Sequence, residues 1–286
     1  MRKQTGLTRI DVAVALECIA LVLAQAAVLN AGGRERAKRE VCLANLRSLA
    51  AAWQTYSGDN SGKIPVGDVW YSWTFPTSSG GPQLAWFEWP HPFPHPMPPN
   101  VATNYYAAYF SISLITQAAW EHATAEGTLW KYVGDYNIYR CPDGDKGQYV
   151  TYSMSHSMNT YPGSGGTGAV TITNINQISK PAERFVFLDT GSFRQGAFFV
   201  EYSGVNVATW CDPPPMRHSQ GTTFSFADGH AIYRKWTDPH TLAAAASGQW
   251  GGGPVDYCDC DLRWMTQITW GSVPFTCTNP NKHCEY

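Results

Sequence analysis

The sequence is poor in charged residues. They make up 15% of the 286 residues, and the formal net charge is −2 at pH 7. Because nucleic acids and acidic surfaces are bound largely through clustered positive charge, this balance gives no electrostatic basis for either partner. Familiar catalytic signatures are also missing, since the chain contains no GxSxG, HExxH or Walker motif. We therefore expect a protein that is not an enzyme, binds no nucleic acid and requires no cofactor.

The cysteines show no CxxC…CxxC spacing of the kind that holds a structural zinc ion. Of the eight, Cys18 lies in an apolar N-terminal stretch, and we expect the other seven in an oxidising compartment, where one thiol is left over. Cys258 and Cys260 are too close in sequence to bridge each other easily. We expect each to pair with one of three cysteines: Cys211, Cys277 or Cys284.

The N-terminal segment carries the strongest signal in the chain. A short basic leader, residues 1–6, ends in Gly6, and an almost wholly apolar run over residues 10–31 follows with one acid near its start, Asp11. As a helix, that run would be roughly 33 Å long, enough to cross a hydrocarbon core of about 30 Å. A carboxylate near the end of such a helix is costly in lipid and needs a partner. We expect a transmembrane or assembly helix over residues 7–31.

Two other interpretations of this segment stay open. An ordinary secretory signal has the same basic start and apolar centre, and Ala24-Gln25-Ala26 has the small-residue pattern of its cleavage site. A membrane anchor that is never processed is the third. None of the three interpretations explains why a second acid, Glu17, lies in the apolar segment.

Beyond residue 31 a helix is expected to continue over residues 34–56. A charged collar over residues 34–40 places Glu35 and Arg36 four residues before Arg39 and Glu40. Apolar residues then recur at steps of three and four, as on the buried face of an amphipathic helix: Cys42, Leu46, Leu49, Trp53 and Tyr56. The Gly- and Asn-containing segment 57–63 should end it.

Residues 64–127 form an irregular insert rich in proline and tryptophan, with a second helix expected over residues 107–125. His91 and His95 in the insert lack further metal ligands nearby in sequence. Four tryptophans form either an exposed stacking platform for sugars or a partner, or a local core under a long loop. They are Trp70, Trp73, Trp86 and Trp89.

From residue 136 onward the pattern favours short β-strands ended by Gly, Pro, Asp or Asn. Asp228-Gly229 between two alternating runs predicts a β-hairpin. The tail over residues 248–286 is rich in Gly and Cys and should be stapled by disulfides. We predict an α+β fold in which the long N-terminal helix packs on an antiparallel sheet, with residues 32–286 as the globular domain.

These features resemble the type IV pilin-like and type II secretion pseudopilin-like proteins that combine a prepilin-type cleavage/methylation segment with a C-terminal region named for His, nine residues and Asp-Gly. Here that region is His218 followed by Asp228-Gly229. The resemblance extends in order through the blocks CLANLRSLAAAWQTYSGDNSGKIP, YRCPD, TYSMSHSMN, KPAERFVFLDTGS and DLRWMTQITWG. It leaves out residues 67–135 and the cysteine-rich tail.

The resemblance implies cleavage by a prepilin peptidase between Gly6 and Leu7 and N-methylation of Leu7. It implies that Asp11 neutralises the new amine of a neighbouring subunit, although the family usually has Phe and Glu where this chain has Leu7 and Asp11. It also implies a disulfide between Cys42 and Cys141.

Related pseudopilins often hold calcium in a C-terminal loop. Here Asp256, Asp259 and Asp261 offer oxygen ligands, or else form a solvated acidic turn. A catalytic or metal trio of His218, Asp228 and His230, extended by Asp189, is a further candidate. Turn chemistry accounts for Asp228 equally well and is favoured.

We therefore expect a filament subunit of a type II secretion-like pseudopilus or a type IV pilus. Before assembly it crosses the inner membrane once, with a periplasmic globular domain. Afterwards it lies in a periplasmic pseudopilus or a surface filament. Its partners are copies of itself, other pilin-like subunits, the peptidase and the inner-membrane assembly platform. The alternative is a tethered or displayed protein whose Trp-rich insert binds polysaccharide.

Overall fold

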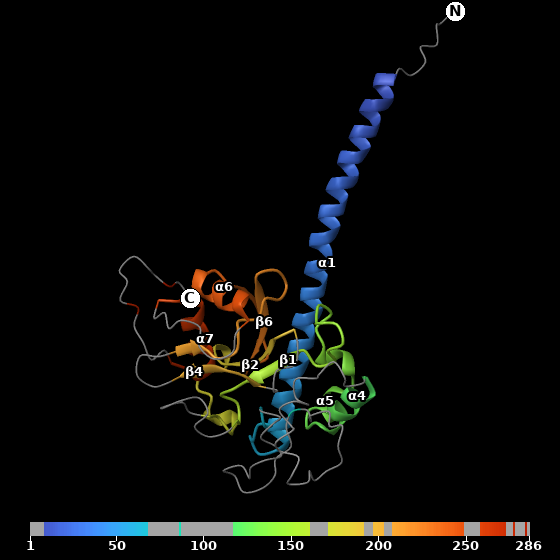
Figure 1. Ribbon diagram of the computed structural model, residues 1–286. Helices are drawn as coiled ribbons and strands as arrows, with labels where there is room; N and C mark the ends of the chain where they lie inside the picture. The colour runs from blue at the N-terminus through green and yellow to red at the C-terminus, as the bar shows by residue number, and fades with distance from the viewer. Residues whose placement is uncertain are drawn as a thin grey trace, which may run out of the picture.

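The computed structural model describes residues 9–67, 86, 117–160, 171–191, 197–202, 208–248, 258–272, 277 and 284. The fold is α+β, as predicted: a long helix, a mixed five-stranded sheet, a small two-stranded sheet and several short helices. Figure 1 shows the helix α1 lying along the globular domain at one end and projecting far from it at the other.

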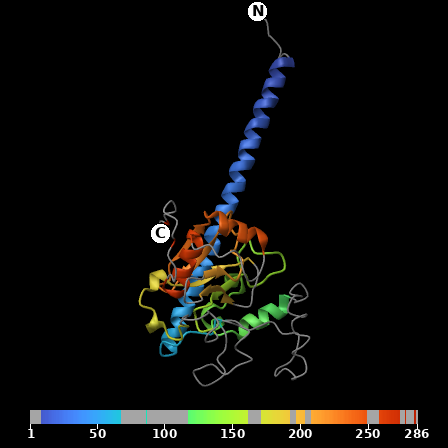
Figure 2. The same ribbon diagram turned by 60° about the vertical axis from the view of Figure 1, so that its left-hand side comes forward.

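Helix α1 (Arg9–Asp59) is continuous over 51 residues. It ends where Ser61 and Gly62 turn into left-handed conformation, with φ of 57° and 82°, within the segment expected to stop it. The projecting half stays clear of the domain in both views (Figure 2). Across the described residues, none of the helices combines the length and apolar character needed to cross a membrane.

The buried stripe predicted for α1 is confirmed. Cys42, Leu46, Leu49 and Trp53 are each 0% exposed, and Tyr56 packs at the edge of the same core. The charged collar behaves differently from expectation. Glu35 and Arg39 do not form the predicted helix-surface pair, because the Glu35 carboxylate reaches His218 and the Arg39 guanidinium lies over the ring of Tyr233.

The main sheet has the strand order β3-β1-β2-β6-β7. Its strands are β1 (Tyr152–Ser155), β2 (Phe185–Asp189), β3 (Ala197–Phe198), β6 (Gly221–Phe226) and β7 (Ala231–Lys235). The prediction of a wholly antiparallel sheet is wrong at one edge, where β3 runs parallel to β1. Strand β3 lies on the side of β1 away from β2 and runs opposite to β2, so it takes the direction of β1. Strands β4 (Val200–Tyr202) and β5 (Ala208–Trp210) form the second sheet.

The hairpin predicted at Asp228-Gly229 is present. It joins β6 to β7 in antiparallel register, with Ser225 opposite Ala231. Gly229 has a φ of 93°, a conformation that a residue without Cβ adopts at little cost.

Each face of the main sheet carries its own hydrophobic core. Because side chains alternate along a strand, Thr223 faces α1 while Phe224 faces the opposite side. The α1 face is closed by the stripe on that helix. The other face is covered by α7 (Cys260–Trp270), whose Trp264 ring lies 5.1 Å from Phe224, with α6 (Pro239–Ser247) beside it. The sheet is therefore the middle of three layers.

The remaining described helices are short. They are α4 (Gln117–Glu126), α5 (Trp130–Val133), and the 3-10 turns η2 (Tyr136–Tyr139), η3 (Ile175–Gln177) and η4 (Pro181–Glu183). Helix α4 overlaps the one predicted over residues 107–125, whose first part lies outside the described residues.

Two disulfides staple the tail, Cys258–Cys277 and Cys260–Cys284. This confirms that Cys258 and Cys260 pair with more distant partners and not with each other. Cys211 is a free thiol of intermediate exposure.

Candidate functional site

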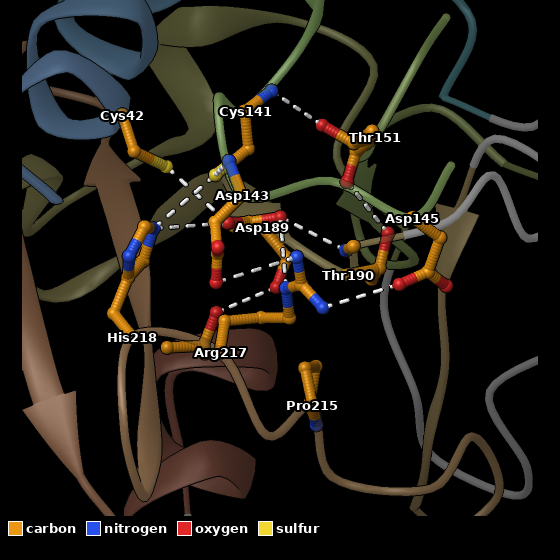
Figure 3. A network of polar contacts seen from close by, with 12 residues as sticks. Cys42, Cys141, Asp143, Asp145, Thr151, Asp189, Thr190, Pro215, Arg217 and His218 are labelled. Carbon is orange, nitrogen blue, oxygen red and sulfur yellow. Dashed lines mark hydrogen bonds and ion pairs between the residues drawn. The ribbon is translucent and has the colours of Figure 1, made fainter. Parts of the chain in front are cut away.

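The most unusual group of side chains lies where α1 crosses the sheet (Figure 3). Two thiols, a carboxylate and an imidazole meet there, from Cys42, Cys141, Asp189 and His218. Their ligand-capable atoms all lie within 4.8 Å of one another, and all four residues are buried. Four such groups buried together away from water require a chemical explanation, because buried polar groups are costly unless they are paired.

Each residue reaches this point from a different element. Cys42 belongs to the buried stripe of α1, and Asp189 ends strand β2. Cys141 follows the η2 turn, where its backbone N–H donates to Thr151 Oγ1 at 2.7 Å. His218 occupies a tight turn before β6 and has a φ of 49°, in the left-handed region that a non-glycine residue seldom adopts. The surrounding packing therefore holds His218 in a strained backbone conformation.

The contacts within the cluster are close. Cys42 Sγ donates to Asp189 Oδ2 at 3.3 Å, and Asp189 Oδ2 lies 3.3 Å from His218 Nε2. The same imidazole nitrogen is 3.2 Å from Cys141 Sγ. One edge of the His218 ring thus faces both the acid and a thiol.

A second layer of donors and acceptors surrounds the cluster. His218 Nδ1 lies 3.1 Å from Glu35 Oε1 of α1. Asp189 Oδ1 accepts from the Gly191 N–H at 2.8 Å. Cys42 Sγ contacts Thr223 Oγ1 at 3.0 Å and accepts from the Tyr152 hydroxyl at 3.4 Å.

Arg217, beside His218 in the chain, lies on the outer side of the cluster. Its Nη1 is 3.3 Å from Asp145, its Nη2 is 3.8 Å from Asp143, and its Nε is 3.9 Å from Asp189. Lys38 of α1 adds a 2.6 Å ion pair with Asp143. The guanidinium and the ammonium together fasten the Cys141 loop to α1 and to the β6 turn.

The surroundings shift the protonation of the cluster. Burial raises the pKa of the Cys42 thiol well above its ordinary value. A hydrogen bond from Cys42 lowers the pKa of Cys141, with His218 acting in the same direction. Burial works against a charged His218, but hydrogen bonds to Asp189 and Cys141 outweigh it and raise its pKa to about 10. In this arrangement His218 is an imidazolium facing a buried carboxylate.

A cavity lies close to the cluster but does not include it. The nearby cavity, of about 150 Å³, is lined by Arg217, Asp145, Thr190 and the prolines 213–215 but by none of the four cluster residues. The donor set of two sulfurs, one nitrogen and one oxygen suits a soft or borderline metal ion.

The disulfide expected between Cys42 and Cys141 is not formed in the structure, which has both as free buried thiols. The two residues do meet, as the resemblance implied. Each thiol also contacts other groups: Cys42 Sγ contacts Asp189 and Thr223, and Cys141 Sγ contacts His218.

The trio of His218, Asp228 and His230 is not assembled. Asp228 accepts from the backbone N–H of His230 in the hairpin turn, and the His230 ring stacks on Phe226 at 4.4 Å. The positions of Asp228 and His230 are therefore explained by the hairpin turn, which is the interpretation that the sequence favoured. His218 instead pairs with Asp189, the residue that the sequence added to the trio.

The tail carboxylates proposed for calcium serve as hydrogen-bond acceptors within the protein. Asp259 caps α7 through the Leu262 N–H and accepts from Thr241 Oγ1. Asp261 accepts from two backbone N–H groups, those of Thr237 and Asp238. Because these acids point to separate partners, they do not form a shared calcium site. Asp256 lies outside the described residues.

Trp86 belongs to the core and not to an exposed platform. It is 0% exposed, stacks on Tyr139 at 6.0 Å and contacts the Phe187 ring edge at 5.1 Å. The other residues predicted in the insert lie outside the described part of the chain: Trp70, Trp73, Trp89, His91 and His95. So do Gly6, Leu7 and the side chain of Asp11.

A scan against protein-family models, a search of curated proteins and a search of solved structures each gave no match to this chain. The functional argument therefore rests on the residues and their geometry. Sequence reasoning missed the four-residue cluster, because its members come from four separate segments with no shared spacing. Two signals in the sequence pointed toward it. The family resemblance implied that Cys42 and Cys141 lie close together, and His218 and Asp189 were both candidates for one catalytic or metal site.

Proposed function

We propose that this protein is a pilin-like subunit that assembles into a pseudopilus or pilus-like filament. The observation that carries the proposal is the division of helix α1 into a docked half and a free half. From Cys42 onward the helix is buried against the sheet, whereas its described apolar side chains near the N-terminus are exposed. They are Val14 at 52%, Leu16 at 61% and Ile19 at 56%.

Exposed apolar side chains on a projecting helix need a cover. Lipid supplies it before assembly, and the same helix of other copies supplies it afterwards. Helices that pack side by side bury this surface without changing the globular domain, which is already closed by its own two cores. The globular domains would then be displayed around a central bundle of helices.

The N-terminal residues fit that assembly. Cleavage between Gly6 and Leu7 would create an N-methylated amine, and Asp11 of a neighbouring subunit would neutralise it. An unpaired charge inside an apolar bundle is costly, so this pair would set the register in which each subunit docks.

The tail supports an exported domain. The disulfides Cys258–Cys277 and Cys260–Cys284 are typical of proteins that fold in oxidising compartments such as the periplasm. In the proposed arrangement the subunit begins as a single-pass inner-membrane protein with this domain outside the cytoplasm. The assembly platform of a type II secretion-like system then adds it to the filament.

The experiment that tests the proposal is intact-mass and N-terminal peptide mass spectrometry on protein recovered from native membranes. We expect a mature chain that begins at Leu7 and carries one additional methyl group. A chain that begins near Ala27, or one that keeps Met1, would contradict the proposal, because neither is the product of a prepilin peptidase.

A further inference from the structure

We propose that Cys42, Cys141, Asp189 and His218 bind a zinc ion in a closed, structural site that fastens helix α1 to the sheet. The inference does not depend on filament assembly. It rests on the identity of the four donors, on their mutual distances, on their burial and on the groups that orient them.

The donor set is one that zinc uses. Zinc is bound in proteins by thiolates, imidazole nitrogens and carboxylate oxygens, usually four in a tetrahedron. Calcium and magnesium are excluded because they prefer oxygen ligands throughout. An iron–sulfur cluster held by four cysteines is excluded because only two sulfurs are in this group.

The distances match a tetrahedral site. With zinc–ligand bonds of about 2.0–2.3 Å, neighbouring ligand atoms lie about 3.3–3.8 Å apart. In the cluster, Cys42 Sγ is 3.3 Å from Asp189 Oδ2, which is 3.3 Å from His218 Nε2. Cys141 Sγ is 3.2 Å from that nitrogen, and all four atoms lie within 4.8 Å of one another. The three short separations are close to those of a tetrahedral site, and the four side chains converge on one point.

The second layer has the form expected around a metal. A zinc-bound histidine usually donates its other N–H to a carboxylate, which fixes the ring and its tautomer. Glu35 Oε1 is in that place, 3.1 Å from His218 Nδ1. Asp189 keeps its second oxygen on the Gly191 N–H, and the Asp143 N–H donates to Cys141 Sγ at 3.3 Å.

The charge of the ion is largely met by its ligands. Two thiolates, one carboxylate and a neutral imidazole around Zn²⁺ leave one net negative charge. Arg217 lies next to the site, with Nε 3.9 Å from Asp189, and its positive charge, which it shares with Asp143 and Asp145, offsets part of this negative charge. The protons released from the two thiols and from His218 on binding go to solvent.

The burial makes this a structural site and not a catalytic one. Cys42, Cys141 and Asp189 are 0% exposed and His218 is 1% exposed, so four protein ligands fill the coordination sphere. Catalytic zinc sites keep one position for water or substrate. The ligands come from α1, the Cys141 loop, β2 and the β6 turn, so the ion would join the helix to three parts of the globular domain.

A neighbouring group of Glu35, Asp143 and His218 is a weaker candidate. Asp143 is already paired with Lys38 and Arg217, which occupy the acceptors a metal would need.

The first test is the metal content of the full chain, purified from cells in detergent without chelator or added metal. Elemental mass spectrometry should find about one zinc per chain. After exchange with Co²⁺, the wild-type protein should show thiolate-to-cobalt charge-transfer absorption, which reports sulfur ligation directly and requires no variant.

Three variants localise the site. Cys42→Ser should lose the bound zinc and the cobalt–thiolate band. Glu35→Gln, which keeps the four ligands and changes only the acceptor at His218 Nδ1, should weaken zinc binding about 10- to 100-fold in chelator competition. Cys211→Ser is the matched control, because Cys211 is a free thiol outside the cluster and its removal should leave zinc at the wild-type level.

Other results would overturn the proposal. One is a Cys42–Cys141 disulfide without zinc in the protein isolated from cells. Others are copper in place of zinc, or full zinc retention in Cys42→Ser. A zinc-free chain that still begins at Leu7 with a methyl group would refute this inference and leave the filament proposal intact.

Discussion

Glu35 on helix α1 lies 3.1 Å from His218 on the turn before β6, its Oε1 facing the ring Nδ1. The contact joins residues 183 positions apart and marks the point at which α1 begins to dock. The charged collar is therefore part of the domain interface, with Lys38 on Asp143 and Arg39 on Tyr233 completing it. From Cys42 onward, the helix contributes fully buried side chains to the core of the fold.

The division of α1 into a docked half and a free half predicts different effects for the truncation of two leucines on this helix. Leu46→Ala removes a fully buried side chain and should lower the free energy of unfolding by about 2–5 kcal/mol. Leu16 is 61% exposed, so Leu16→Ala should change that free energy by less than about 0.5 kcal/mol while reducing filament yield. Urea unfolding of both full-length variants in detergent, with electron microscopy of sheared filaments, measures both effects. Equal destabilisation by the two would contradict the division.

The proposed register pair predicts that Asp11→Ala blocks filament assembly and leaves the folded domain intact. Without the carboxylate, the mature amine of the next subunit would be buried unpaired. Filament yield and near-UV circular dichroism of the variant measure the two outcomes. Normal filaments from Asp11→Ala would remove the register role.

Trp86→Ala should destabilise the protein by about 3–5 kcal/mol, because the ring fills the core against Tyr139 and Phe187. Trp86→Phe keeps an aromatic ring and should cost less. Thermal unfolding compares the two. If Trp86 were a sugar platform, the alanine variant would keep its stability and lose polysaccharide binding.

His156 predicts acid sensitivity. Burial lowers its pKa from 6.5 to about 3 in the folded protein. Between these values the unfolded chain takes up a proton that the folded protein does not. The stability is therefore fully present above pH 6.5 and is lost progressively as the pH falls toward 3. At pH 4.5 the loss should be roughly 2–3 kcal/mol relative to neutral pH.

The measurement is urea unfolding at neutral pH and at pH about 4.5. His156→Gln should remove this part of the acid-induced loss. A wild-type dependence in His156→Gln would show that another group is responsible.

Much of the fold followed from local patterns in the sequence. The stripe from Cys42 to Trp53 predicted which face of α1 is buried, because helical spacing alone sets which side chains share a face. Asp228-Gly229 predicted the β6–β7 hairpin through turn chemistry that acts over a few residues. The number and spacing of the tail cysteines predicted that disulfides cross-link the tail.

Where the sequence erred, longer-range packing decided the outcome. The parallel β3 edge depends on where the chain re-enters the sheet after β2, which no local pattern encodes. Asp259 and Asp261 were proposed either as calcium ligands or as a solvated acidic turn, but the packing of α6 and α7 made both of them buried hydrogen-bond acceptors. For Trp86 the sequence left a sugar platform and a local core open, and packing against the main core decided for burial.

The sequence by itself determined the long helix, its buried stripe, the hairpin and the N-terminal segment with Asp11, since each depends on residues near one another in the chain. Only the tertiary structure brought Cys42, Cys141, Asp189 and His218 to one point. Their convergence depends on the docking of α1 across the sheet and on the left-handed turn at His218, and both are fixed by packing across the whole domain.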